Sequence, residues 1–168
     1  MANNHESLSM TAPDTPRKSL TRRGVLTGAA TLALGGGAIF AANWFNITAQ
    51  AGQAGALSAT EAHMAANAGS ITLIDIRRPD EWARTGTGVG ANPINMLDRD
   101  FIEQLTALVD GDTTVPVALI CARGVRSRKM GARLTQAGFT NILDVPEGML
   151  GSGAGPGWIK RGLPVTKG

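Results

Sequence analysis

The chain has 168 residues, 22 of them glycine, with 17% charged residues and a formal net charge of +3. This length suits one domain plus an extension, and a single cysteine excludes an intramolecular disulfide framework and a cysteine-based metal cluster. Residues 1–51 carry an excess of two positive charges, so residues 52–168 are nearly neutral, with 12 Lys/Arg against 11 Asp/Glu. We therefore expect no nucleic-acid partner, no metal and no cofactor.

Residues 1–51 have the features of an export signal. Arg22 and Arg23 stand directly before a weakly apolar stretch, and no charged residue occurs from Gly24 to Thr60. An arginine pair at this place resembles the twin-arginine signal, and weak hydrophobicity is typical of such leaders. We expect residues 1–51 to direct export to the periplasm and to lie outside the folded domain, residues 52–168.

The fate of this leader has two alternatives. Ala49-Gln50-Ala51 has the small-residue pattern of a signal-peptidase site, and Ala54-Gly55-Ala56 is a second candidate. The apolar segment from Gly24 to Ala42 has 19 residues, which is long enough to cross a bilayer. An uncleaved leader would therefore anchor the protein to the membrane, facing the periplasm, and would be its membrane contact.

Helical and strand patterns alternate from Ser58 onward. Ser58 and Glu61 have the spacing of a capping box, which predicts a helix through about Ala68. The apolar, β-branched stretch 71–76 predicts a buried strand. A turn or a short helix follows over residues 77–82.

The middle of the chain contains a glycine-rich connection and two further elements. Residues 85–90 lack the lysine of a phosphate loop, so we expect a flexible connection there. Residues 93–96 predict a short strand, and Asp98 is expected to cap a helix through about Val109. The face of this helix that is expected to pack inward holds Phe101, Leu105 and Leu108.

A strand, a helix and a last strand complete the pattern. Residues 116–120 predict a strand, a helix follows from about Arg128 to Ala137, and residues 141–145 predict the last strand. The glycine-rich tail 148–168 holds a turn centred on Trp158. Strands alternating with helices predict an α/β fold, with a small parallel sheet of four or five strands and helices on both faces.

Cys121 follows the strand at 116–120 and begins a loop rich in arginine and glycine. A helix N-terminus and nearby arginines stabilise a thiolate, and successive backbone N–H groups can surround a bound anion. Gly124 permits the backbone angles of such a curl, while Arg123 and Arg126 can attract an anionic substrate. The pattern predicts a cysteine nucleophile in an anion-binding loop, whose other members are Ala122, Arg123, Gly124, Val125 and Ser127.

Three matches in the right order resemble the rhodanese family. The stretch from Cys121 to Ser127 resembles its C-x-x-G-x-R-S/T active loop, and Asp75-Ile76-Arg77 with Glu81-Trp82 resembles its D-x-R…E-aromatic box. Gly138-Phe139-Thr140-Asn141-Ile142 resembles the segment that leads into the family's last strand. The resemblance covers about residues 56–165 and implies a rhodanese-like α/β fold.

This resemblance implies a sulfurtransferase. In that family the cysteine thiolate takes a sulfane sulfur from a donor such as thiosulfate, holds it as a persulfide and passes it to cyanide or a thiol. Here Cys121 and Arg126 would be catalytic, and Ser127 would cap the following helix or donate to the thiolate. Asp75 and Arg77 are expected to form an ion pair that supports the loop rather than to react with substrate.

Other functions are weighed against this one. Four residues separate Cys121 from Arg126, one fewer than in the related phosphatases and arsenate reductases, and the shorter loop favours sulfur over phosphate. A non-enzymatic rhodanese-like module that carries sulfur or binds a partner is the alternative, but the intact cysteine and arginine favour the enzyme. Ala122 replaces the family's usual basic residue and Thr85–Ala91 lacks its usual histidine, so the donor stays open, as do the acceptor and the oligomeric state.

Overall fold

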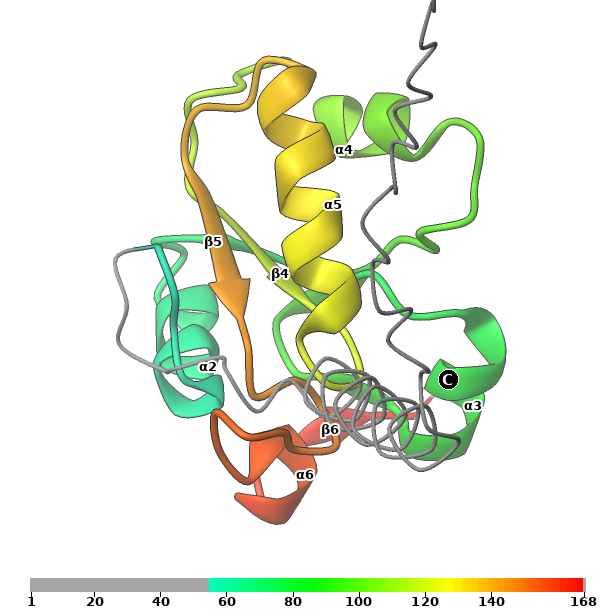
Figure 1. Ribbon diagram of the computed structural model, residues 1–168, viewed down its shortest axis with the longest axis vertical. Helices are drawn as coiled ribbons and strands as arrows, with labels where there is room; N and C mark the ends of the chain where they lie inside the picture. Colours follow the sequence, from blue (N-terminus) through cyan, green and yellow to red (C-terminus); the bar gives the residue numbers. More distant parts are fainter. Residues whose placement is uncertain (1–54, 168) are drawn as a thin grey trace, which may run out of the picture. The chain divides into compact units, whose positions relative to one another are not determined.

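The computed structural model describes residues 55–167, so the predicted leader lies outside the described residues. Helices and strands alternate along this part of the chain, except that β2 and β3 follow one another (Figure 1). The helices are α2 (Ala59–Asn67), α3 (Pro79–Thr85), α4 (Phe101–Leu108), α5 (Val125–Gln136) and α6 (Gly157–Lys160). The strands are β1 (Thr72–Asp75), β2 (Thr87–Gly88), β3 (Ala91–Pro93), β4 (Val117–Ile120), β5 (Ile142–Val145) and β6 (Val165–Thr166). None of the helices between residues 55 and 167 is long and apolar enough to span a bilayer.

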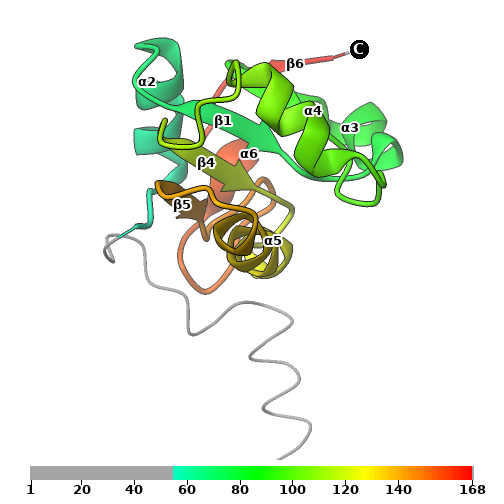
Figure 2. The same cartoon turned by 90° about the horizontal axis from the view of Figure 1, so that it is seen from above.

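Four of these strands form one parallel sheet in the order β3-β1-β4-β5, and β1, β4 and β5 lie side by side in Figure 2. Strand β4 lies inside the sheet and all of its residues are buried, which explains why its sequence is continuously apolar. The carboxyl ends of parallel strands meet at one edge of the sheet, where open α/β folds place their sites. Cys121 follows β4 at that edge. A small second sheet is the antiparallel pair β2-β6.

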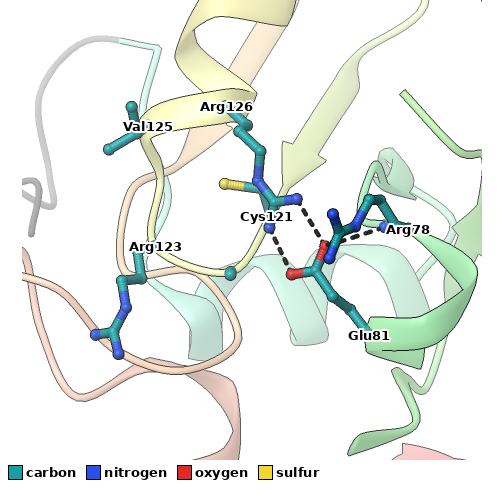
Figure 3. A pocket seen from close by; sticks show the side chains of 7 residues that line it. Arg78, Glu81, Cys121, Arg123, Val125 and Arg126 are labelled. Atoms are coloured by element: carbon teal, nitrogen blue, oxygen red, sulfur yellow. Dashed lines mark hydrogen bonds and ion pairs between the residues drawn. The ribbon is translucent and has the colours of Figure 1, made fainter. Parts of the chain in front are cut away.

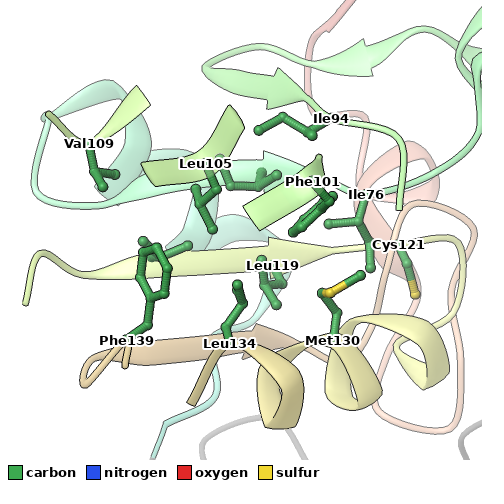
Figure 4. Packing of buried hydrophobic residues seen from close by; sticks show 12 residues of the cluster. Ile76, Ile94, Phe101, Leu105, Val109, Leu119, Cys121, Met130, Leu134 and Phe139 are labelled. Atoms are coloured by element: carbon green, nitrogen blue, oxygen red, sulfur yellow. The ribbon is translucent and has the colours of Figure 1, made fainter. Parts of the chain in front are cut away.

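Helices cover both faces of the parallel sheet, as the sequence predicted. Along β4, Val117 and Leu119 join the core beneath α4 and α5, whereas Ala118 and Ile120 join the core beneath α2 and α6, because successive side chains of a strand point to opposite faces. The first core, drawn in Figure 4, includes Phe101, Leu105, Met130, Leu134 and Phe139. The second includes Ala59, Ala62, Met149 and Trp158. The predicted α/β class with a small parallel sheet of four or five strands is confirmed, and the sheet has four.

The helix after the cysteine begins three residues earlier than the sequence predicted, at Val125 instead of Arg128. Gly124 is its N-cap and has a left-handed φ of 77°. Glycine adopts this conformation without a steric penalty, so the chain turns directly from the loop into the helix. Arg126 and Ser127 therefore belong to the first turn of α5.

Helix α4 packs a slightly different face from the one predicted. Phe101 and Leu105 are buried, but Leu108 is 43% exposed and Val109 is buried in its place. Residues spaced four apart stay on one stripe of a helix, and Val109 continues the stripe of Phe101 and Leu105. The N-cap of this helix is not Asp98 but the residue two positions later.

The glycine-rich segment 85–90 is structured, so the expectation of a flexible connection is wrong. Thr85 ends α3, and β2 then pairs with β6 near the end of the chain. A Cβ atom on Gly88 would lie 2.6 Å from the indole of Trp158, so this close packing requires glycine. The glycine pattern reflects a tight contact between distant segments rather than flexibility.

Candidate active site

The sulfur of Cys121 is held by atoms of its own loop. The side chain is buried at the carboxyl end of β4, and the Gly124 N–H donates to Sγ over 3.1 Å. The thiol donates to Ser127 Oγ at 3.6 Å, and the Ser127 hydroxyl donates to the Gly124 carbonyl at 3.1 Å. Ser127 thus contacts the sulfur as an acceptor and not as the predicted donor, and Gly124, not Ser127, is the N-cap of the helix.

The C-terminal segment supports the loop from behind. Met149 N–H donates to the Cys121 carbonyl and Leu150 N–H to the Ala122 carbonyl, both at 2.9 Å. Gly148 has a left-handed φ of 65°, and a Cβ atom there would lie 2.5 Å from the Ala122 carbonyl oxygen. No larger residue fits this approach of two backbones. The sequence interpretation named the tail but missed this supporting role of Gly148.

Arg126 forms a bidentate ion pair with Glu81 across the pocket. Its two terminal nitrogens donate to the two carboxylate oxygens of Glu81, at 2.7 and 2.6 Å (Figure 3). Arg126 holds the pKa of Glu81 at about 2, against the opposing effect of burial. Glu81 in turn raises the pKa of Arg126, and Cys121 contributes in the same direction. The guanidinium is therefore a fixed cation beside the sulfur, oriented by a glutamate that the sequence interpretation assigned only to a motif.

Arg123 lies on the loop but points away from the cysteine (Figure 3). One of its terminal nitrogens donates to the Gly151 carbonyl at 3.1 Å. The sequence interpretation paired Arg123 with Arg126 as two cations for one anion, but the structure directs their side chains to different sides of the pocket.

Asp75 and Arg77 form the ion pair that the sequence predicted, and both are buried. Arg77 donates to the two oxygens of Asp75 through Nε and a terminal nitrogen, at 2.6 to 3.0 Å. The same guanidinium donates to Thr85 Oγ1 and to the Gly86 carbonyl, each at 2.7 Å. These bonds fix the end of α3, the helix that carries Glu81. The pair therefore supports the loop indirectly, through α3 and the Glu81–Arg126 contact.

A cavity of about 370 Å³ opens onto the cysteine, and its walls are the loop and the start of α3. Its lining residues are Arg78, Glu81, Cys121, Ala122, Arg123, Val125 and Arg126. Five predicted loop members thus line it, Gly124 and Ser127 contact the sulfur, and Asp75 and Arg77 lie outside it. Arg78 was not predicted, because nothing in its local sequence distinguishes it from a surface arginine. Among residues 55–167, no three His, Cys, Asp or Glu side chains gather as a metal site requires.

The fold and the site define a class of protein: a small parallel α/β domain that presents a cysteine, in a loop capped by a helix, to an open cationic pocket. Comparison with known proteins gives the family. The rhodanese-like domain matches residues 58–152. The chain is also 31% identical over 118 residues to thiosulfate sulfurtransferase 16, chloroplastic, of Arabidopsis thaliana, covering 65% of this chain and 90% of that protein. The chain belongs to the rhodanese family, whose general chemistry is sulfur transfer.

Solved structures agree with this assignment. The solution structure of the polysulfide-sulfur transferase homodimer from Wolinella succinogenes is similar with a TM-score of 0.54 and 28% identity, covering 78% of this chain and 89% of that one. Thiosulfate sulfurtransferase from Pseudomonas aeruginosa has a TM-score of 0.54 and 23% identity, covering 67% of this chain and 20% of that one. The second likeness shows the fold alone.

Proposed function

We propose that this protein is a sulfurtransferase in which Cys121 takes a sulfane sulfur from a donor such as thiosulfate and passes it to cyanide or a thiol. The observation that carries the proposal is the position of Cys121, which is one of the residues lining the open pocket and whose Sγ receives the Gly124 N–H at 3.1 Å. The family relationship gives the general chemistry, and this geometry supports the assignment of the nucleophile.

The reaction has two displacement steps at sulfur. In the first, the Cys121 thiolate attacks the outer sulfur of thiosulfate, the sulfur–sulfur bond of the donor breaks, and sulfite leaves with the electron pair. In the second, the acceptor attacks the outer sulfur of the persulfide, and the electron pair of the breaking bond returns to Cys121. Arg126 stabilises the departing anion, and the loop amides stabilise the persulfide.

Three other residues position these groups. Glu81 orients the Arg126 guanidinium through two hydrogen bonds. Asp75 and Arg77 hold the helix that carries Glu81. A buried bidentate pair restricts the rotamers of both partners, so we assign Glu81, Asp75 and Arg77 positioning roles.

Mass spectrometry tests the proposal directly. After incubation with thiosulfate, the purified protein should gain the mass of one sulfur atom on the peptide containing Cys121, and cyanide should remove it as thiocyanate over many turnovers. A sulfur adduct that cyanide discharges only once, without repeated turnover, would instead favour the sulfur-carrier alternative. Absence of any adduct would exclude both sulfur-based functions.

We also propose that residues 1–51 direct export through a twin-arginine route and that residues 52–168 form the working domain. The support is the pair Arg22-Arg23 before a charge-free stretch, followed by Ala49-Gln50-Ala51. Changing both arginines to lysine should trap the precursor in the cytoplasm, as measured by cell fractionation. Unchanged export of the double variant would overturn the twin-arginine assignment, and an exported protein with its original N-terminus would favour the membrane anchor.

A further inference from the structure

The pocket beside Cys121 is larger than an inorganic donor needs. Its volume of about 370 Å³ lies within the range of cavities that hold small organic ligands, roughly 300–1,000 Å³. Thiosulfate and cyanide are far smaller than such ligands. The size of the pocket therefore leaves room for an organic acceptor whose thiol reaches the sulfur on Cys121.

The charged side chains that line this pocket differ in the partners they already have. Arg126 and Glu81 neutralise each other through two hydrogen bonds of 2.6 and 2.7 Å. Arg123 is turned toward the Gly151 carbonyl on the other side (Figure 3). The remaining cation on the α3 wall is Arg78, whose side chain lies beside Glu81.

Arg78 forms an ion pair with Asp80 that a carboxylate ligand can replace. Its Nε lies 3.1 Å from Asp80 Oδ1 and 3.6 Å from Glu81 Oε2, and a terminal nitrogen donates to Asp80 Oδ2 at 3.1 Å. The side chains of Arg78 and Asp80 are 50% and 54% exposed. Exposed ion pairs of this kind contribute little free energy, so a carboxylate entering the pocket can replace Asp80 at low cost.

We propose that Arg78 determines acceptor specificity by binding the carboxylate of a small organic thiol while the sulfur of that thiol meets the persulfide of Cys121. This inference rests on the proposed function of Cys121. The planar guanidinium of arginine suits a carboxylate because two parallel N–H groups meet its two oxygens. Because Arg78 lies across the pocket from the loop, the acceptor can place its carboxylate at Arg78 and its thiol at Cys121.

The transfer of sulfur from the Cys121 persulfide to the acceptor thiol needs no further reactant. The acceptor thiol first loses its proton to solvent, and its thiolate attacks the outer sulfur of the Cys121 persulfide. The bond between the two sulfurs on the enzyme breaks, its electron pair stays on Cys121 Sγ, and the acceptor leaves as a persulfide. Arg78 binds the acceptor and takes no part in the bond exchange.

The chain offers a matched control in Arg84. This arginine lies on α3, the helix for which Arg78 is the N-cap, and it pairs with the same Asp80 at 3.2 Å, but its side chain is 67% exposed and it does not line the pocket. A general loss of positive charge from α3 would affect Arg78→Ala and Arg84→Ala alike. Only a specific contact in the pocket would separate the two variants.

The experiment measures discharge of sulfur-loaded protein by matched thiols. The full chain is loaded with thiosulfate and freed of excess donor, and discharge by 3-mercaptopropionate and by 2-mercaptoethanol is compared at equal thiolate concentration. We expect the wild type to prefer the carboxylated thiol by about fivefold, the size of one partly exposed charged contact. Arg78→Ala should bring the ratio to about one, Arg78→Lys should recover part of it, and Arg84→Ala should keep it.

Two results would overturn the inference, and they are distinguishable. Sulfur that loads on Cys121 and is discharged by cyanide, with no thiol preference or with one that survives Arg78→Ala, would overturn the role of Arg78 alone. Failure of the wild type to load sulfur at all would overturn the proposed function and this inference with it.

Discussion

The two walls of the pocket are built in different ways. The loop wall is local: Gly124 and Ser127 reach the sulfur of Cys121 from three and six residues away. The α3 wall is held by a contact between residues far apart in sequence, because Glu81 accepts hydrogen bonds from Arg126, 45 residues later. Arg77, at the entrance to α3, fixes the far end of that helix by its bonds to Thr85 and Gly86.

The two walls therefore have different roles: the loop wall carries the reacting group, and the α3 wall orients the charged groups around it. The loop wall places a nucleophile and its amide donor with contacts that form as soon as the chain turns into α5. The α3 wall decides where the Arg126 cation points and which charges an incoming ligand meets. Changes in the loop should therefore act on the reaction itself, and changes in α3 should act on orientation, specificity and stability.

The largest effect should come from replacing the nucleophile. Cys121→Ser should abolish turnover completely, because a serine alkoxide does not form near neutral pH and does not hold a sulfane sulfur. The buried site is compact and the substitution is nearly isosteric, so folding should be retained. Thiocyanate formation and a thermal melt measured together check both expectations. Residual turnover in the folded variant would remove the persulfide mechanism.

The second largest effect should come from replacing Arg126, which belongs to the loop wall and donates hydrogen bonds to Glu81 of the α3 wall. Arg126→Ala should cost about 2–4 kcal/mol of transition-state stabilisation, the size of losing a strong oxyanion donor, and it also removes the two hydrogen bonds that Glu81 accepts from Arg126. Arg126→Lys should recover only part, since an ammonium keeps the charge but not the planar fork. The measurement is kcat/KM for thiosulfate with cyanide.

A matched control for this prediction is Arg133→Ala. Arg133 is an exposed arginine in the last turn of the same helix and does not line the pocket, so its loss should leave kcat/KM unchanged. If Arg126→Ala and Arg133→Ala both retained the wild-type rate, the loop backbone would be the anion site and Arg126 would have no catalytic role.

The buried pair beneath α3 should matter more for stability than for turnover. Asp75→Asn leaves the Arg77 charge buried with a neutral partner, and we expect it to lower the free energy of unfolding by about 3 kcal/mol, the low end for a broken buried pair. Activity of the folded variant should fall less than in either loop variant. Urea unfolding and kcat/KM, measured at the same temperature, separate the two effects. Complete loss of activity at wild-type stability would show that Asp75 acts directly.

The same division explains what the sequence could predict. The parallel sheet, the helices on both of its faces and the loop at Cys121 follow from apolar runs, caps and a motif whose parts are neighbours in sequence. Gly124 was predicted to turn the loop, because a left-handed glycine is a local requirement.

The features that were missed depend on tertiary contacts. The Glu81–Arg126 pair joins residues 45 positions apart, and the support from Gly148 appears only when two backbone segments meet. The segment 85–90 was expected to be flexible, and what orders it is pairing with β6, a strand that is distant in sequence. Exact side-chain directions, such as that of Arg123 toward Gly151, follow from packing and leave no pattern of their own.

The smallest predicted effect is a pH dependence of stability that comes from Glu81. Its pKa is lowered from 4.5 to about 2 in the folded protein, so the folded state favours the ionised form. That stabilisation is fully present above pH 4.5 and is lost as the pH falls from there toward 2. We expect it to be about 1–2 kcal/mol after allowance for solvent screening. Between pH 5 and pH 3 the wild type should lose most of this stabilisation, whereas Glu81→Gln should not, as measured by urea unfolding at each pH. Glu103→Gln, at an exposed glutamate of α4, is the matched control and should follow the wild type. Parallel pH curves for wild type and Glu81→Gln would mean that the contact between the two walls adds nothing to folding and serves only to orient Arg126.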